Sequence, residues 1–346
     1  MKKVGIIGHF GFGHDLLNGQ TIKTKIISSE LKKEYGVDNV WEIDTHGGVV
    51  SYLKIPFMVL FSLVMCQNVI ILPAQNGLRI IAPILYMLNV FFRRKTHYVV
   101  IGGWMPSLIK NNVFLCGCLK RLDRIYVETS VMRDLLISMG FLNIVIMSNC
   151  KPLKIVEKEC LPKEPNKPLK FCLFSRVMKQ KGIEHAIYAI NQLNAFYGVN
   201  TCCLDIYGQI DEREKMWFEN LQKSFSEDIS YGGVVDFDKS VDTLKCYDAL
   251  IFPTLFYTEG IPGTIIDAYA AGIPVISSRW ASFSDVVDDG IVGFGYEFGS
   301  QDALFELMKN IVSRPNQLVE MKCFCVDKAE NFLPCNAMRV LKNNLN

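Results

Sequence analysis

The apolar residues of this chain fall into short runs that alternate with longer segments of helical spacing. Such alternation predicts a parallel sheet, because parallel strands are buried on both faces and are joined by crossover helices. The predicted strands of the first half are Val4 to Gly8, Val40 to Ile43, Val69 to Leu72, Tyr98 to Ile101, Arg124 to Val127 and Ile144 to Met147. With a helix expected over Thr21 to Glu34, the pattern indicates a doubly wound α/β domain.

A second series of strands follows a stretch that lacks either hydrophobic period. Residues 157–170, EKECLPKEPNKPLK, contain three prolines and alternating charges, which is typical of a linker. The strands predicted after it are Leu169 to Phe174, Cys203 to Tyr207, Ile229 to Val235, Ala249 to Phe252 and Ile273 to Ser277. A chain of 346 residues exceeds the roughly 250–300 at which single cores stop growing. We therefore expect one domain over residues 1–165 and another over 166–330.

Residues 248–293 carry the clearest candidate site. A buried strand ends at Pro253, and a polar loop with Thr258, Glu259 and Gly260 leads into a helix that stops at Gly272. The loop and the start of this helix should lie at the carboxyl edge of a parallel sheet, where open α/β sheets bind ligands. Free backbone N–H groups from Gly260 to Thr264 would suit an anion there, most naturally a diphosphate.

The acids of this stretch resemble the signature of family 4 retaining glycosyltransferases, which have the GT-B fold. Glu259 is followed eight positions later by Asp267, with GIPG after the first acid and AAGIPVISS after the second. The resemblance implies two Rossmann-like domains facing a cleft, with the two acids on the sugar and the ribose of a nucleotide-sugar donor. Asp267 departs from the usual Glu and loses one methylene of reach. The alternative is a solvated loop acid at Glu259 and a helix-surface charge at Asp267.

Two cations match further positions of the family pattern. Arg176 and Lys181 occupy the places of the Arg and Lys that bind the donor diphosphate, whereas Lys179 is better explained as a solvated charge. Gly208 resembles the glycine turn near the nucleotide. The resemblance thus implies a catalytic set of Glu259, Arg176 and Lys181. It implies a donor-binding set of Gly19, Gln20, Gly208, Gly260, Ile261, Pro262, Gly263, Thr264 and Asp267.

The N-terminal half offers weaker matches. Asn18-Gly19-Gln20-Thr21 resembles the first loop of the family, although a glycine turn with Thr21 as helix N-cap explains it equally well. Gly103 and Trp104 follow a predicted strand and are candidates for an acceptor contact, or else form a tight turn with a packed Trp. Residues 331–346 are candidates for the last helix, which in GT-B proteins crosses back to the N-terminal domain.

Composition excludes several functions. The 37 Lys and Arg residues nearly balance the 35 Asp and Glu residues, which argues against a broad nucleic-acid surface. The twelve cysteines include no CxxC, and many lie in apolar runs, so we expect no zinc site and a reducing, cytoplasmic compartment. Asp236-Phe237-Asp238 is a DxD motif, but it precedes a helix of the GT-B pattern and is discounted. We expect no metal and no cofactor.

Two apolar segments raise the question of membrane binding. Residues 55–66 and 80–92 carry no charge, but a spanning helix needs roughly 20 apolar residues. We expect both to cover the sheet as core helices. The basic cluster Arg93-Arg94-Lys95 beside Phe91-Phe92 permits shallow contact with the anionic inner face of the cell membrane.

The expected function is transfer of a sugar, with retention and without a metal, from a UDP- or GDP-sugar to a glycan or lipid-linked acceptor. Cell-surface polysaccharide biosynthesis is the expected setting. Two alternatives stay open, namely a GT-B nucleotide-sugar epimerase and a non-catalytic nucleotide-sugar-binding subunit. Asp267 in place of Glu is the sequence feature that favours the second alternative.

Overall fold

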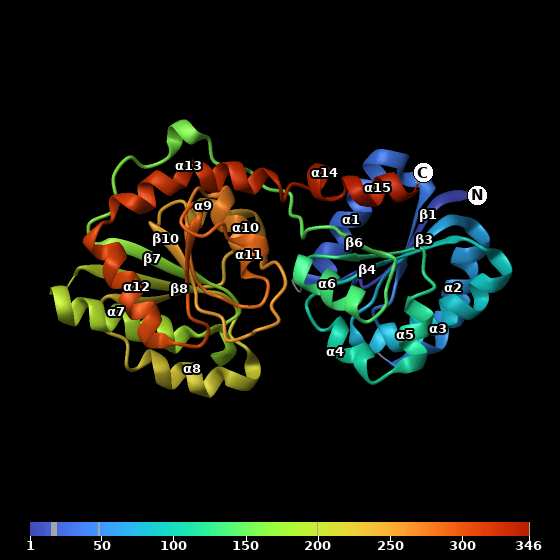
Figure 1. The fold of residues 1–346 in the computed structure, drawn as a ribbon, viewed down its shortest axis with the longest axis horizontal. Coiled ribbons are helices and arrows are strands. Elements are labelled where there is room, and N and C mark those ends of the chain that lie inside the picture. Colours follow the sequence, from blue (N-terminus) through green and yellow to red (C-terminus); the bar gives the residue numbers. More distant parts are fainter. Residues whose placement is uncertain (15–18, 48, 199, 346) are drawn as a thin grey trace. The chain divides into compact units, whose positions relative to one another are not determined.

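The computed structural model describes residues 1–14, 19–47, 49–198 and 200–345, with the backbone alone for 49–52. The chain forms two compact units, Met1–Pro152 together with the residues from Leu333 onward, and Leu153–Phe332. Each unit contains a parallel six-stranded sheet with helices on both faces (Figure 1). The doubly wound α/β fold expected from the sequence is therefore confirmed.

The first sheet has the strand order β2-β1-β3-β4-β5-β6. Its strands are β1 Lys2–Gly8, β2 Val40–Asp44, β3 Cys66–Leu72, β4 Lys95–Val99, β5 Arg124–Val127 and β6 Ile144–Ile146. The strand order reverses between β1 and β3, so the carboxyl ends of these two strands form the switch point at which such sheets bind ligands.

The β4 strand corrects the expectation of a strand over Tyr98 to Ile101. It begins at Lys95 and ends at Val99, so two of its buried residues are polar. Thr96 donates its N–H to the Asp123 carboxylate at 2.7 Å, and the His97 ring lies 3.2 Å from the Tyr126 hydroxyl. Because both polar side chains have partners, the strand continues through residues that interrupt the apolar run.

Helices cover the two faces of the first sheet. One face is covered by α2 Val49–Met65, α3 Gln75–Phe92, α4 Met105–Lys110, α5 Val113–Leu119 and α6 Ser130–Ser138. The opposite face is covered by α1 Gly19–Tyr35, α14 Pro334–Ala337 and α15 Arg339–Leu345. Met338, Leu341 and Leu345 pack into the same buried cluster as α1, which joins the end of the chain to its first unit.

The division between the units lies earlier than the expected boundary near residue 165. Leu153 and Ile155 already pack against the core of the second unit, and the Val156 N–H donates to the carbonyl of Ala270 at 2.8 Å. The Pro-rich stretch that follows therefore belongs to the second unit.

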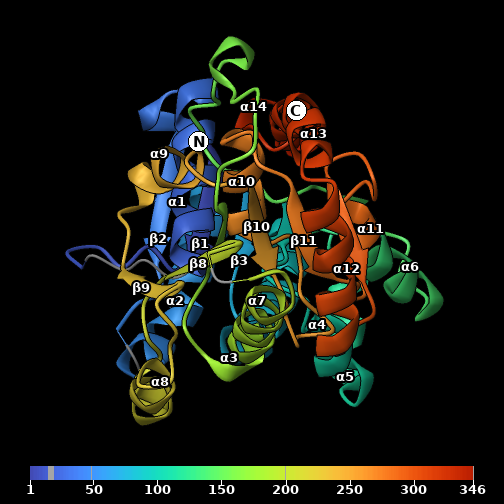
Figure 2. The same cartoon turned by 90° about the vertical axis from the view of Figure 1, so that its left-hand side faces the viewer.

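The second sheet has the order β12-β11-β10-β7-β8-β9, which reverses between β7 and β10. Its strands are β7 Leu169–Phe174, β8 Cys202–Tyr207, β9 Ile229–Gly233, β10 Ala249–Phe252, β11 Val275–Ser278 and β12 Gly293–Tyr296. Its helices are α7 Ile183–Tyr197, α8 Lys215–Gln222, α9 Ser240–Leu244, α10 Gly263–Ala270, α11 Phe283–Val286, α12 Gln301–Ser313 and α13 Asn316–Glu330. Helices α7 and α12 lie side by side on one face (Figure 2), and α10 packs against α13 on the other.

Candidate functional site

The loops after β7 and β10 meet at the switch point of the second sheet. Gly182 ends the first loop in the left-handed region, with φ of 70°, and a Cβ atom there would lie 1.9 Å from the carbonyl oxygen of Pro253. The Leu255 N–H donates to the carbonyl of Gln180 at 2.9 Å. A residue without a side chain is therefore required at 182, because the two loops touch backbone to backbone.

This contact brings together two of the predicted residues, Lys181 and Glu259. The Lys181 ammonium lies 2.7 Å from Oε2 of Glu259, which also accepts a hydrogen bond from the Thr254 hydroxyl at 3.3 Å. Both side chains are partly exposed, at 16% and 21%. The ammonium also lies 5.6 Å and 5.2 Å from the ring centroids of Phe252 and Phe256, within the range of cation–π attraction.

The α10 helix begins directly after this ion pair with open hydrogen-bond donors. Pro262 precedes the first helical residue and supplies no side-chain cap, and the helical bonding starts with Ile265 donating to the Pro262 carbonyl. Within the described part of the chain, the N–H groups of Gly263 and Thr264 have no hydrogen-bond partner, and neither has the buried Thr264 hydroxyl. The positive end of the helix can therefore receive an anion.

Three members of the predicted donor-binding set, Ile261, Pro262 and Asp267, have buried side chains. Ile261 packs into the core, and the side chain of Asp267 is 3% exposed and already engaged within the protein. Gly260, by contrast, lies in the loop between Glu259 and the helix. In this structure the backbone of residues 260–264 is better placed to meet a ligand than the Asp267 carboxylate is.

The loops after β7 and β8 also run together, with Gly208 at their contact. Gly208 has φ of 135°, and a Cβ atom there would lie 1.8 Å from the carbonyl oxygen of Ser175. Next to it, the Val177 N–H donates to the Gln209 carbonyl at 2.9 Å. The glycine turn expected at 208 thus positions the segment that carries Arg176.

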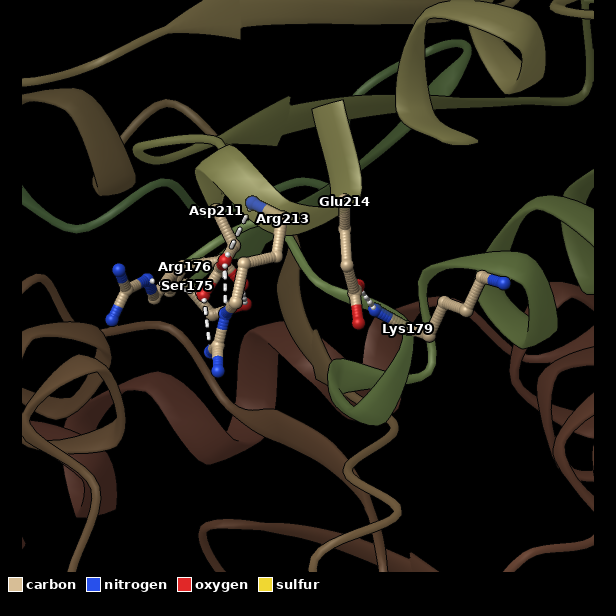
Figure 3. Close-up of polar contacts among 6 residues, drawn as sticks. All are labelled: Ser175, Arg176, Lys179, Asp211, Arg213 and Glu214. Carbon is tan, nitrogen blue, oxygen red and sulfur yellow. Dashed lines mark hydrogen bonds and ion pairs between the residues drawn. The ribbon is translucent and has the colours of Figure 1, made fainter. Parts of the chain in front are cut away.

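Arg176 is paired with an acid that the sequence did not single out (Figure 3). Its Nε atom lies 3.3 Å from Oδ2 of Asp211, which also receives two hydrogen bonds from the Arg213 guanidinium at 3.0 and 3.1 Å. The side chain and backbone N–H of Arg213, followed by the charge of Arg176, lower the pKa of Asp211 to about 2. An Asp directly before Glu-Arg-Glu is a helix N-cap signal that could have identified this residue.

Lys179 is separate from these contacts, as the sequence suggested. Its backbone N–H donates to the Glu214 carboxylate at 2.5 Å, and its ammonium lies over the Trp217 ring. In Figure 3 its side chain points away from Asp211 and Arg176. The structure therefore separates Lys179 from Lys181, although both belong to one short 3-10 turn.

The DxD motif takes part in a local ion pair. Asp236 precedes a 3-10 turn and lies 2.9 Å from the ammonium of Lys239, three residues later. Among the residues with described positions, no group of three or more His, Cys, Asp or Glu side chains is arranged to hold a metal ion.

The predicted residues of the N-terminal half gather at the switch point of the first sheet. A cavity of about 430 Å³ there is lined by Gln20 and Trp104, with Pro73, Gln75 and Asn76 beside them. The Gln20 amide donates to the carbonyl of Leu72 at the end of β3, at 3.1 Å. Gly19 begins α1 and Gly103 lies in the turn before Trp104, whereas Asn18 falls outside the described residues. The structure thus places Gln20 and Trp104 in one cavity.

A histidine cluster that the sequence did not reveal borders this cavity. The His9 ring lies 2.7 Å from the Thr21 hydroxyl through Nδ1 and 3.0 Å from His46 through Nε2, and His14 packs against His46. Burial and the neighbouring His46 lower the pKa of His9. Thr21 is buried within α1 and bonded to His9, so it is not the helix N-cap that the alternative reading of this loop required.

Comparisons with known proteins agree with this architecture. Residues 168–314 match the family model of group 1 glycosyl transferases. Anabaena HepE, crystallised with UDP and glucose, superimposes over 100% of this chain and 99% of its own with a TM-score of 0.75 at 12% identity. A Rickettsia africae glycosyltransferase gives 0.74 at 13% identity, over 99% and 97% of the two chains.

A sequence relative covers a smaller part of the chain. An uncharacterised 41.2 kDa protein in the cps region of Klebsiella pneumoniae is 29% identical over 153 residues, which span 44% of this chain and 39% of that protein. The structural matches extend over the full chain, whereas the family model matches most of the second unit. The chain therefore has the GT-B fold, and its second unit is similar to the group 1 glycosyl transferases.

Proposed function

We propose that this protein is a glycosyltransferase that moves a sugar from a UDP- or GDP-sugar to a glycan or lipid-linked acceptor in cell-surface polysaccharide biosynthesis. The observation that carries the proposal is the Lys181–Glu259 ion pair beside the open N-terminus of α10, at the switch point of the second sheet. HepE structures that hold UDP or UDP-glucose support a nucleotide-sugar donor. The cps region named for the Klebsiella relative supports the polysaccharide setting.

The donor diphosphate would bind at the start of α10. The N–H groups of Gly263 and Thr264 supply two donors aligned with the helix dipole, and Lys181 adds a cation from the opposite loop. Arg176, more than half exposed, has the reach and the forked donors to complete the set. These groups would stabilise the charge that develops on the departing diphosphate, so the proposed reaction needs no metal.

Glu259 would contact the sugar of the donor. Its carboxylate accepts a hydrogen bond from Lys181, so the sugar contact and the leaving group would share one ammonium. We propose retention of the anomeric configuration, in keeping with the family resemblance at Glu259, and the anomeric proton of the product in NMR spectra tests it. Glu259→Gln should lower turnover by roughly 10²–10³ and nucleotide affinity far less.

Calorimetric titration with UDP, UMP, GDP and GMP tests the diphosphate site. Lys181→Ala and Arg176→Ala should each weaken diphosphate binding by roughly 1.5–3 kcal/mol and monophosphate binding less. The structure supplies matched controls. Lys179→Ala removes a lysine from the same turn, and Arg213→Ala removes the other arginine on Asp211. If the variants lost equal affinity for mono- and diphosphates, the diphosphate would have to bind elsewhere. The same would follow if the control variants lost as much diphosphate affinity as Lys181→Ala and Arg176→Ala.

Turnover assays separate the two alternatives that the sequence left open. An epimerase would convert the donor sugar without an acceptor, whereas a transferase releases nucleotide diphosphate only when an acceptor is present. A non-catalytic subunit would bind the donor and turn over none of an acceptor panel. Asp267→Glu bears on this second alternative, because it restores the usual family acid at a position where the side chain is buried.

A further inference from the structure

Helix α2 is apolar on the side that faces away from the sheet as well as on the side that covers it. Ile55, Val59 and Leu63 are buried against the first sheet, as expected for a core helix. The opposite side exposes Leu53, Phe57, Leu60, Phe61 and Val64, at the spacing of one helical stripe. A helix that is apolar all round is normally buried in protein or in lipid, so this stripe indicates a partner.

The neighbouring helices extend the same apolar surface. Helix α3 packs against α2 and α5 packs against α3, and all three cover one face of the first sheet (Figure 1). Phe91 on α3 is 82% exposed, and Phe114 on α5 is 62% exposed. Among the side chains that the structure describes, the exposed large apolar ones of these helices are Leu53, Phe57, Leu60, Phe61, Val64, Met65, Met87, Val90, Phe91, Val113 and Phe114. We call these residues the apolar face.

The charged residues of the segment that carries the apolar face have a single sign. All 35 acidic residues of the chain lie outside the segment from Thr45 to Leu122, which contains every residue of the face. The segment does contain basic residues, namely Lys54, Arg79, Arg93, Arg94, Lys95, Lys110, Lys120 and Arg121. Because the whole chain has a net charge of only +2, this one-sided distribution is a local property of the segment.

A basic cavity of about 480 Å³ lies at the end of α3, next to Val90 of the apolar face. Arg93, Arg94 and Arg121 line it, and the Arg121 guanidinium lies over the Tyr86 ring. One carboxylate, that of Asp123, also lines the cavity, but it accepts hydrogen bonds from the backbone and hydroxyl of Thr96. The cavity is therefore lined mainly by cations, and it adjoins an exposed apolar surface.

We propose that the apolar face binds a lipid bilayer that contains anionic phosphodiester lipids, with one phosphate headgroup in the arginine cavity. Apolar side chains would enter the acyl boundary, and the surrounding lysines and arginines would meet the headgroups. A protein partner with this charge pattern would have to bury many cations against acids, whereas a bilayer supplies phosphates at every position. In the part of the chain that the structure describes, no helix is long and apolar enough to cross a membrane.

Flotation of the full chain with lipid vesicles tests the proposal. One vesicle is pure phosphatidylcholine, and the other contains about a third phosphatidylglycerol. The protein should float with the anionic vesicle, and this binding should weaken as the salt concentration rises. In Arg93→Gln/Lys95→Gln/Arg121→Gln the partition coefficient should drop roughly a hundredfold, since each basic residue near such a surface contributes about fivefold. Phe57→Ser/Phe61→Ser/Phe91→Ser should lose binding to both vesicles.

Matched variants of the second unit control for general effects. Phe324→Ser removes an aromatic side chain of similar exposure from α13, and Lys215→Gln/Lys223→Gln removes two exposed cations from the region of α8. Both should float like the wild type, and every variant should keep its UDP affinity. Equal flotation with both vesicles would overturn the headgroup part of the proposal. A dimer in sedimentation that the Phe→Ser variant dissociates, without vesicle binding, would assign the face to a second copy of the chain.

Discussion

Gly182 offers a direct test of how the candidate site is assembled, because it joins the loops that carry Lys181 and Glu259. An Ala side chain at this position would meet two separate penalties. The residue has φ of 70°, a conformation that costs a residue with a Cβ about 1–2 kcal/mol. Its Cβ would also lie 1.9 Å from the Pro253 carbonyl oxygen, so one of the loops must move.

The structure contains a glycine that isolates the first penalty. Gly299 has φ of 78°, and nothing lies within 4 Å of a Cβ built there. Gly299→Ala should therefore destabilise the second unit by about 1–2 kcal/mol. Overpacking adds about 1–3 kcal/mol, which brings Gly182→Ala to about 2–5 kcal/mol. For a unit of about 180 residues each kcal/mol lowers the unfolding midpoint by about 2–4 °C.

Tryptophan fluorescence can follow the second unit alone. The chain has four tryptophans, and replacing Trp41 and Trp104 by Phe leaves only Trp217 and Trp280, both in that unit. In this background the midpoint of thermal unfolding should fall further for Gly182→Ala than for Gly299→Ala. UDP affinity should fall in Gly182→Ala and hold in Gly299→Ala, because only the first displaces the loop before Glu259. Equal midpoints and equal affinities for the two variants would refute the backbone contact as the organising feature of the site.

Two further predictions concern buried polar groups of the first unit. Lys23 forms a buried ion pair with Glu128 and donates to the Val100 carbonyl. Lys23→Met should therefore cost about 3–5 kcal/mol in urea unfolding, and adding Glu128→Leu should recover part of it. Burial lowers the pKa of His97 to about 4, below the value of about 6.5 in the unfolded chain. Its contribution to stability is thus complete above pH 6.5 and is lost as the pH falls towards 4, by up to about 3 kcal/mol. His97→Gln should weaken the pH dependence of the unfolding midpoint over that range. An unchanged pH dependence would contradict the role given to His97.

The sequence predicted most reliably the strands whose buried residues are all apolar. Residues Arg124 to Val127, Leu169 to Phe174 and Ala249 to Phe252 have the same bounds in the structure as in the prediction. The polar pair Thr96 and His97 concealed the start of β4, since their partners come from distant positions in the chain. Periodicity reports whether a side chain is apolar, and it cannot report that a polar side chain has a partner.

The same limit explains what was missed at the surface of α2. The uncharged segment 55–66 predicts a core helix that buries one side, and the core contacts of Ile55 and Val59 confirm that side. Whether the other side is covered depends on which helices lie next to it. Only the structure shows that α3 packs alongside and leaves Phe57 and Phe61 in contact with solvent.

The candidate site separates what a motif can predict from what the fold adds. Lys181 and Glu259 were each identified by their place after a strand, as independent ligands of one donor. Their direct contact follows from the strand order, because β7 and β10 are neighbours in the sheet although 78 positions separate the two residues. Arg176 shows the converse. Its motif position is correct for the loop after β7, but its partner Asp211 follows β8, the neighbour of β7 on the other side. The two cations of one motif are thus held by opposite neighbours of the same strand, Arg176 by an acid after β8 and Lys181 by an acid after β10.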